Sequence, residues 1–184
     1  RGLGDVYKRQ LSSRSPILME DALKRGWPLF RMAPSENDET SAVAEIMLRD
    51  WKGLPFALLD DGTIYSRELV DRVRARLEEA GLKPTFTDTL RPSQEQQIAL
   101  VRRLSRTGVT HVFAATERND LSIIARDAAA EKIPLVLMGS DALRAANAPV
   151  PLQPGTLAVA LPDYAALPSA AEAVQQLRAA SIEP

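Results

Sequence analysis

The pattern of apolar and polar positions is clearest at residues 54–82, where it predicts a strand, a loop and a helix. The continuous apolar run at 55–59 is typical of a strand buried on both faces, and it ends in the acidic pair at 60–61. Ser66 is the expected helix N-cap, and apolar residues then recur at helical spacing until Gly81. A buried strand followed by an amphipathic helix is half of a βαβ unit.

The same succession of strand and helix repeats along the chain. Apolar runs predict further strands at 27–32, 85–89, 110–115, 133–138 and 156–161. Helical spacing predicts helices at 19–25, 39–51, 93–106, 120–131 and 169–180, with a short helix and loop within 142–154. Ser93 and Gln96 form the expected capping box of the helix at 93–106.

Strands separated by helices of this length predict a parallel sheet with right-handed crossovers. The expected fold is therefore α/β, a doubly wound and mainly parallel sheet with helices on both faces. Threonines alternate with other residues at 85–89, which indicates an edge strand or one with a solvated face.

Composition excludes several classes of protein. With 184 residues, 45% of them hydrophobic, the chain can form one ordinary domain with a core. A formal net charge of −1, with basic and acidic residues interspersed, gives no electrostatic reason to expect nucleic acid or an anionic membrane as a partner. No apolar run approaches the roughly 20 residues of a membrane helix. Cysteine is absent, which excludes disulfides and thiolate chemistry.

Both ends of the sequence suggest a fragment. Residues 1–10 lack a starting methionine and any pattern that leads into the next segment, and 5–10 (DVYKRQ) read as the translated end of a sequencing-library adapter. We therefore interpret 1–10 as a non-native segment. Residues 183–184 follow directly on a predicted helix, so we also expect a truncated C-terminus. A signal peptide would lie in the missing N-terminal part.

Acids, hydroxyls and one tyrosine follow the predicted strands. They lie at 60–65 (DDGTIY), at 116–117 (TE) and at 139–141 (GSD). The carboxyl ends of parallel strands share one edge of a sheet, where doubly wound folds bind ligands. Converging acids suit a cationic group such as an ammonium, and an aromatic ring adds a packing face. For each residue alone, a role as helix cap or solvated loop residue is equally compatible with its type.

Signals for an enzyme are weak. No glycine-rich phosphate loop or GxSxG nucleophile motif follows a strand, and no metal-ligand spacing is present, so we expect no cofactor and no metal. The single histidine, His111, lies within a predicted strand and is interpreted as a packed or edge residue. A phospho-acceptor domain would need an aspartate and a lysine after later strands, where this chain has Ala115-Thr116 and Leu161-Pro162.

Several segments together resemble the type I periplasmic binding proteins, and in particular the substrate-binding components of branched-chain amino-acid ABC transporters. The segments at 29–35 (LFRMAPS) and 57–65 (ALLDDGTIY) are similar to the family's "FR..PSD" and "DD..YG" patterns. Further similarity lies at 110–117 and 135–139, and at Pro184. The resemblance extends from about residue 15 onward.

The resemblance implies a two-lobed receptor that closes on its ligand at a hinge. Residues 11–33 would be a remnant of the first lobe with the crossing segment, and 34–184 the second lobe. Tyr65 would pack on the ligand, and Asp141 would pair with the ligand's α-ammonium. Glu36 matches an acid near the crossing. Glu117 falls where members often place an aromatic residue.

The resemblance favours a non-enzymatic, periplasmic and monomeric solute-binding protein, which would bind an amino acid and deliver it to a membrane permease. Two other classes stay open. One is a ligand-sensing domain of a regulatory or signalling protein with the same fold. The other is an enzyme on an α/β scaffold, favoured only by the acidic loops. An upstream signal peptide, a DNA-binding or kinase module, or detectable turnover would distinguish the three.

Overall fold

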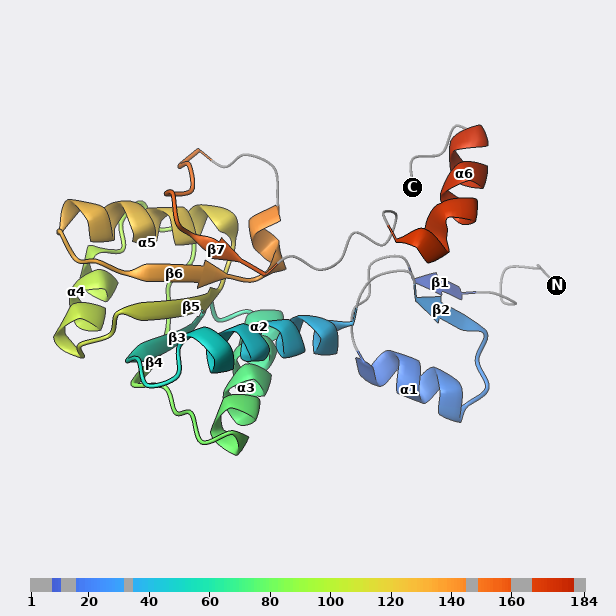
Figure 1. Cartoon of the computed structure of the whole chain (residues 1–184), viewed down its shortest axis with the longest axis horizontal. Helices are drawn as coiled ribbons and strands as arrows, with labels where there is room; N and C mark the ends of the chain where they lie inside the picture. Colours follow the sequence, from blue (N-terminus) through green and yellow to red (C-terminus); the bar gives the residue numbers. More distant parts are fainter. Residues whose placement is uncertain (1–7, 11–15, 32–34, 145–148, 160–166, 181–184) are drawn as a thin grey trace.

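The computed structural model describes residues 8–10, 16–31, 35–144, 149–159 and 167–180, and it contains two parallel sheets (Figure 1). The strands are β1 (Lys8–Gln10), β2 (Leu29–Arg31), β3 (Phe56–Asp60), β4 (Phe86–Thr89), β5 (His111–Ala115), β6 (Val136–Gly139) and β7 (Leu157–Ala158). The α-helices are α1 (Pro16–Lys24), α2 (Glu36–Asp50), α3 (Ile64–Glu79), α4 (Ile98–Arg106), α5 (Arg118–Ala130) and α6 (Ala171–Ala179). Two 3₁₀ helices are η2 (Asp141–Arg144) and η4 (Pro168–Ala170).

The larger sheet has the strand order β4-β3-β5-β6-β7, and every neighbouring pair is parallel. The chain first moves from β3 outward to β4 and then returns to the other side of β3 to add β5, β6 and β7. This reversal defines a switch point between β3 and β5. The predicted α/β fold is confirmed, including the edge position and half-solvated pattern of β4.

The hydrophobic core has two layers, one on each face of this sheet. Along β3, Phe56 and Leu58 pack with residues of α2 and α3, whereas Ala57 and Leu59 pack with residues of α4 and α5. All four side chains are fully buried. The continuous apolar run that predicted this strand therefore reflects helices on both of its faces (Figure 1).

The smaller sheet lies apart from the larger one in Figure 1, and α1 packs beside β2. β1 pairs with β2 in parallel, so β1, α1 and β2 form a short βαβ unit. β1 comes from the segment that we interpreted as non-native. Backbone groups alone make a strand ladder, so pairing at this position demands no particular side chains.

The predicted N-cap of α3 is wrong by one turn. Thr63 is the cap, and its hydroxyl accepts a hydrogen bond from the Ser66 N–H at 3.2 Å. Ser66 itself is buried, and its hydroxyl donates to the Ala115 carbonyl of β5 and accepts from the Asp61 N–H. The hydroxyl that was expected to start the helix instead joins the helix to the adjacent strand.

The predicted capping box of α4 is also wrong. The helix begins at Ile98, and Ser93 lies in a turn with a φ of +58°. Acids of α5 fulfil the capping role. Asp120 accepts a hydrogen bond from the Ser93 N–H at 2.8 Å, and Asp127 accepts one from the Gln97 N–H. Side chains from another element therefore satisfy the amides before α4.

The remaining differences concern element ends. α2 begins at Glu36, three residues earlier than predicted, behind a capping box formed by Ser35 and Asp38. β6 and β7 are shorter than their apolar runs, and α6 follows a 3₁₀ turn. The predictions for 145–148, for 160–161 of the last strand and for the two C-terminal residues lie outside the described residues.

Gly139, at the end of β6, is required for close packing. A Cβ atom there would lie 2.6 Å from Cγ and Cδ1 of Leu143, a buried residue of η2. We expect Gly139→Ala to lower the free energy of unfolding by about 1–3 kcal/mol, because the added methyl group overpacks this contact. Urea unfolding measures the change.

The matched background is Leu143→Ala, which removes the atoms that the new methyl group would meet. Gly139→Ala should cost much less in that background than in the wild-type chain. An equal cost in both backgrounds would contradict the contact with Leu143 as the cause.

Candidate functional site

The carboxyl ends of β3 and β5 meet at the switch point, and the loops that follow them form the candidate site. Within the loop after β3, Asp60 accepts hydrogen bonds from the Gly62 N–H at 2.8 Å and from the Thr89 hydroxyl at 3.0 Å. Asp61 accepts from both the N–H and the hydroxyl of Thr63, at 3.0 and 2.7 Å. These two acids therefore shape the loop that leads into α3.

The structure brings two of the predicted site residues together, Tyr65 and Asp141. Tyr65 lies in the first turn of α3, and Asp141 is the first residue of η2, two residues after the end of β6. The Tyr65 hydroxyl donates to Oε2 of Glu39 at 2.7 Å, and the Asp141 N–H donates to Oε1 of the same carboxylate at 2.8 Å. One carboxylate thus connects both residues at this edge of the sheet.

Glu39 was missed by the sequence reasoning. It lies in α2 and its side chain is 0% exposed. A signal for it was present, because Glu39 precedes the buried Val43 and Met47 at intervals of four residues and so shares their inward face. An acid at an inward helical position is the kind of buried polar group that needs a specific partner.

The other two predicted site residues are not joined to this group by the hydrogen bonds of the described residues. Glu36 accepts a hydrogen bond from Nη2 of Arg72 at 3.0 Å, which links α2 to α3. Glu117 is exposed and precedes α5 as its N-cap, and its carboxylate accepts no hydrogen bond from the backbone N–H groups of that helix end. Ligand contact by Tyr65, Asp141, Glu36 and Glu117 stays a prediction.

The segment that carries Asp141 is fixed from two sides. The Arg118 guanidinium of α5 donates to the Leu143 carbonyl at 3.3 Å, and the Ser140 hydroxyl accepts from the Ala142 N–H at 3.3 Å. Ser140 is fully buried and Leu143 nearly so. The backbone around Asp141 is therefore held by α5 as well as by Glu39.

His111 lies at the opposite edge of the sheet, as the first residue of β5. Its ring centroid is 5.2 Å from that of Trp51, which is buried, and burial lowers the pKa of the imidazole. The interpretation of His111 as a packed residue agrees with this position. No group of three or more histidine, cysteine or acidic side chains suited to a metal occurs in the described part of the chain.

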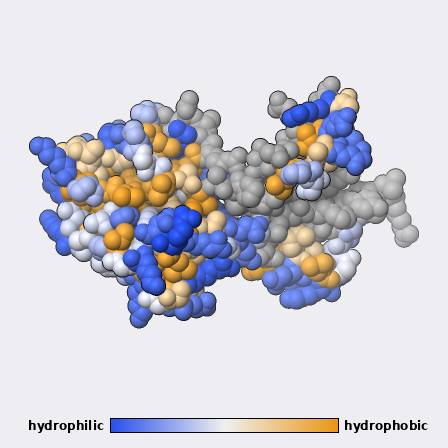
Figure 2. Space-filling view, in the orientation of Figure 1, coloured by the Kyte–Doolittle hydropathy of each residue, from blue (hydrophilic) through white to orange (hydrophobic). Residues whose placement is uncertain are grey.

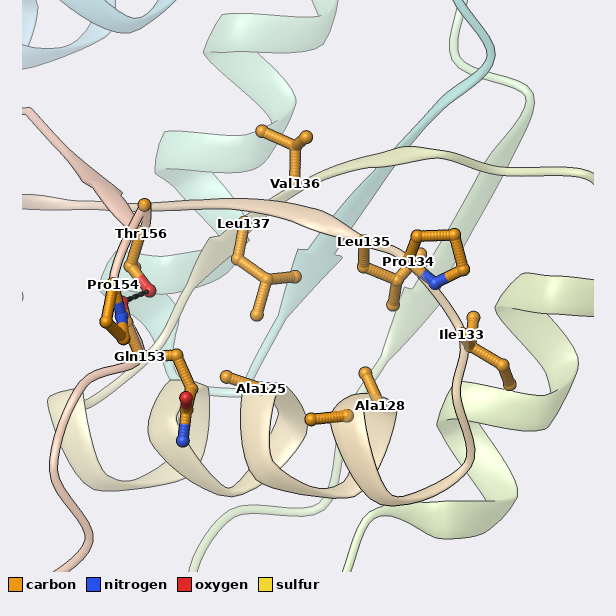
Figure 3. A pocket seen from close by; sticks show the side chains of 12 residues that line it. Ala125, Ala128, Ile133, Pro134, Leu135, Val136, Leu137, Gln153, Pro154 and Thr156 are labelled. Atoms are coloured by element: carbon orange, nitrogen blue, oxygen red, sulfur yellow. Dashed lines mark hydrogen bonds between the residues drawn. The ribbon is translucent and has the colours of Figure 1, made fainter.

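Two hollows of the surface are lined by residues other than Tyr65 and Asp141. One, of about 350 Å³, lies between α5 and the segment leading into β6, with Ala125, Ala128 and Leu135 among its lining residues (Figure 3). Another, of about 700 Å³, lies beside Ser93 and Asn119.

Apolar patches interrupt the polar surface over the five-stranded body in the view of Figure 2. β6 and β7 each expose one large apolar side chain, at Val136 and Leu157.

Across the described residues, no helix combines the length and apolar character required to cross a membrane.

Curated proteins with similar sequences are named as amino-acid-binding proteins. A Leu/Ile/Val-binding protein homolog 1 of Brucella suis is 25% identical over 161 residues, which cover 86% of this chain and 43% of that protein. A Leu/Ile/Val-binding protein homolog 2 of Brucella abortus is 26% identical over 161 residues, with the same coverage. The chain thus spans less than half the length of these relatives. No protein-family model matches it.

Solved structures with a similar fold are type I periplasmic binding proteins. The periplasmic binding protein type 1 of Bordetella pertussis has a TM-score of 0.56 at 23% identity, over 63% of this chain and 31% of that one. A branched-chain amino acid ABC transporter protein of Thermus thermophilus with bound valine has a TM-score of 0.55 at 22% identity, over 61% and 29%. The resemblance is confirmed, and the fold is that of this class.

Asp120 gives the site edge a testable pH dependence. The residue is buried, and burial raises the pKa of its carboxyl group; the charge of Asp61 adds to this, whereas the hydrogen bond from the Ser93 N–H opposes it. An acid with a raised pKa in the folded state destabilises that state as pH rises above the unfolded-state pKa, because the fold then holds a disfavoured charge.

We expect Asp120→Asn to remove this dependence while keeping an oxygen that accepts from the Ser93 N–H. The free energy of unfolding of the wild-type chain, minus that of the variant, should rise as pH falls from 7 toward about 4, the usual range of the aspartate pKa. Urea unfolding at a series of pH values measures this difference. A difference that falls over the same range would contradict the assignment.

Proposed function

We propose that this chain contributes the second lobe of an extracytoplasmic solute-binding protein, which binds an amino acid between two lobes and delivers it to the permease of an ABC transporter. The observation that carries the proposal is the placement of Tyr65 and Asp141. The two residues meet at the switch-point edge of the sheet through one buried carboxylate. The names of the curated relatives support the same class of function.

The fold alone does not determine the class of ligand. One structural neighbour contains valine, whereas a solute binding protein of R. palustris, with a TM-score of 0.53 at 10% identity, is in complex with 4-hydroxybenzoate. Valine carries an ammonium group and 4-hydroxybenzoate does not. An acid after the end of β6, Asp141, favours a ligand with a cationic group, which supports an amino acid. In this proposal Asp141 binds the ammonium group and the Tyr65 ring packs on the ligand.

The proposed mechanism is closure of two lobes on the ligand. An ammonium bound only to Asp141 would remain half solvated, so affinity requires contacts from a second surface. Ligand that contacts both lobes binds the closed state more tightly and shifts the population toward it. The permease would then recognise the closed form, and no bond of the ligand would be made or broken.

A ligand-sensing domain of a regulatory protein would use the same edge of the sheet. The two functions differ in what the closed state contacts, a membrane permease or an attached module. The names of the curated relatives favour transport, so we propose the sensing function second.

The proposal predicts that Asp141→Ala weakens amino-acid binding by the full-length protein. Removing one member of a hydrogen-bonded charge pair costs about 2–5 kcal/mol of binding free energy, or roughly 30-fold or more in Kd. Isothermal titration calorimetry with leucine, valine and related amino acids measures the change, and 4-hydroxybenzoate serves as a ligand without an ammonium group.

The control is Asp71→Ala, an exposed acid of α3 that pairs with Arg74 on the helix surface. This variant should bind as the wild-type protein does. Wild-type affinity in the Asp141→Ala protein would refute the assigned role of Asp141, and tighter binding of 4-hydroxybenzoate than of any amino acid would refute the ligand class.

A further inference from the structure

We infer that Glu39 is a positioning residue of the binding site: it sets the relative placement of Tyr65 and Asp141 without contacting the ligand itself. The inference rests on the proposed function, and it assigns a role to a residue outside the predicted ligand contacts. Its basis is the pair of hydrogen bonds that one buried carboxylate accepts from these two residues.

The two residues belong to segments that nothing in the local sequence holds together. Tyr65 and Asp141 begin different helices after different strands, and Asp141 is separated from Glu39 by 102 positions in the chain. A ligand that packs on the tyrosine ring and pairs with the Asp141 carboxylate depends on the distance between them. Glu39 holds both residues, because its carboxylate accepts hydrogen bonds from the Tyr65 hydroxyl and from the Asp141 backbone N–H.

The position of Glu39 makes it a rigid support. It is 0% exposed in the first turn of α2, on the face that carries Val43 and Met47. Burial limits the rotamers available to the side chain and keeps water from competing for its oxygens. Binding geometry is usually maintained by buried groups on rigid elements, which hold the ligand-contacting residues in place through hydrogen bonds.

The chemistry of the two bonds predicts which substitutions preserve the geometry. Glutamine retains one oxygen for the Asp141 N–H and offers an N–H to the tyrosine oxygen, which can accept as well as donate. Glu39→Gln therefore keeps both links with reversed polarity at Tyr65. Glu39→Ala loses both links. Glu39→Asp keeps the charge but is one methylene group shorter, so it cannot hold both donors without movement of the backbone.

The test is the affinity of the full-length protein for its best amino acid, measured by calorimetry for the wild type and the three Glu39 variants. We expect Glu39→Ala and Glu39→Asp to weaken binding by about tenfold or more, and Glu39→Gln to stay within about threefold of the wild type. Glu39→Asp also keeps the test decisive if Glu39→Ala does not fold.

The matched control is Asp127→Ala, which removes another buried carboxylate that accepts a backbone N–H, in the helical layer on the other face of the sheet. It should lose stability as Glu39→Ala does and still bind within about twofold of the wild type. If Asp127→Ala weakens amino-acid binding as much as Glu39→Ala does, general destabilisation explains both losses and the inference is overturned.

A readout without ligand accompanies the affinities. The NMR signal of the Asp141 amide proton should move upfield in Glu39→Ala, because the hydrogen bond to the carboxylate is lost, and should move less in Glu39→Gln. Wild-type affinity in Glu39→Ala, or in Glu39→Asp if Glu39→Ala does not fold, would overturn this inference and leave the proposed function intact. A wild-type protein that binds none of the amino acids would overturn both.

Discussion

The structure depends on the burial of β3 on both of its faces. Phe56 to Leu59 are fully buried, and no polar face is available to meet water. Such a strand needs a helical layer on each side, so the chain must cross over the sheet in both directions. Because the chain crosses to both faces, the direction in which strands are added reverses between β3 and β5. At this switch point the loops after the two strands diverge at the carboxyl edge of the sheet. The candidate site is therefore a consequence of how the core is closed.

The polar residues at this edge stabilise the fold as well as the site. Asp60 and Asp61 accept bonds within the loop before α3, Ser66 joins α3 to β5, and Asp120 binds the turn at Ser93. Buried amides and hydroxyls require partners, and the strand ends concentrate them. Acidic residues clustered in the sequence therefore indicate a place where loops contact one another, and they are not by themselves evidence for a ligand. The backbone of Asp141 also has a partner at this edge, because its N–H donates to the carboxylate of Glu39.

Sequence periodicity predicted the fold and the edge that carries Tyr65 and Asp141. A strand buried on both faces leaves a continuous apolar run in the sequence, and polar residues directly after the run mark where the strand ends. Helix caps were predicted less well. Ser66 suits a cap as well as Thr63 does, and only the proximity of Ala115 in β5 decides between them. Likewise, the backbone N–H of Gln97 donates to Asp127 of α5, a partner that the local sequence does not indicate. Contacts between elements distant in the chain selected among residues that were locally equivalent.

Glu39 shows why such a contact can be proposed as functional. A leucine there would continue the apolar face formed with Val43 and Met47 and would avoid the desolvation of a carboxylate, and buried ionic groups are often replaced by apolar ones without loss of stability. The helix therefore departs from its own pattern at one position. The departure has a specific result, since both partners of Glu39 lie at the switch-point edge. Local patterns are broken most often where function requires a group that stability alone would not select.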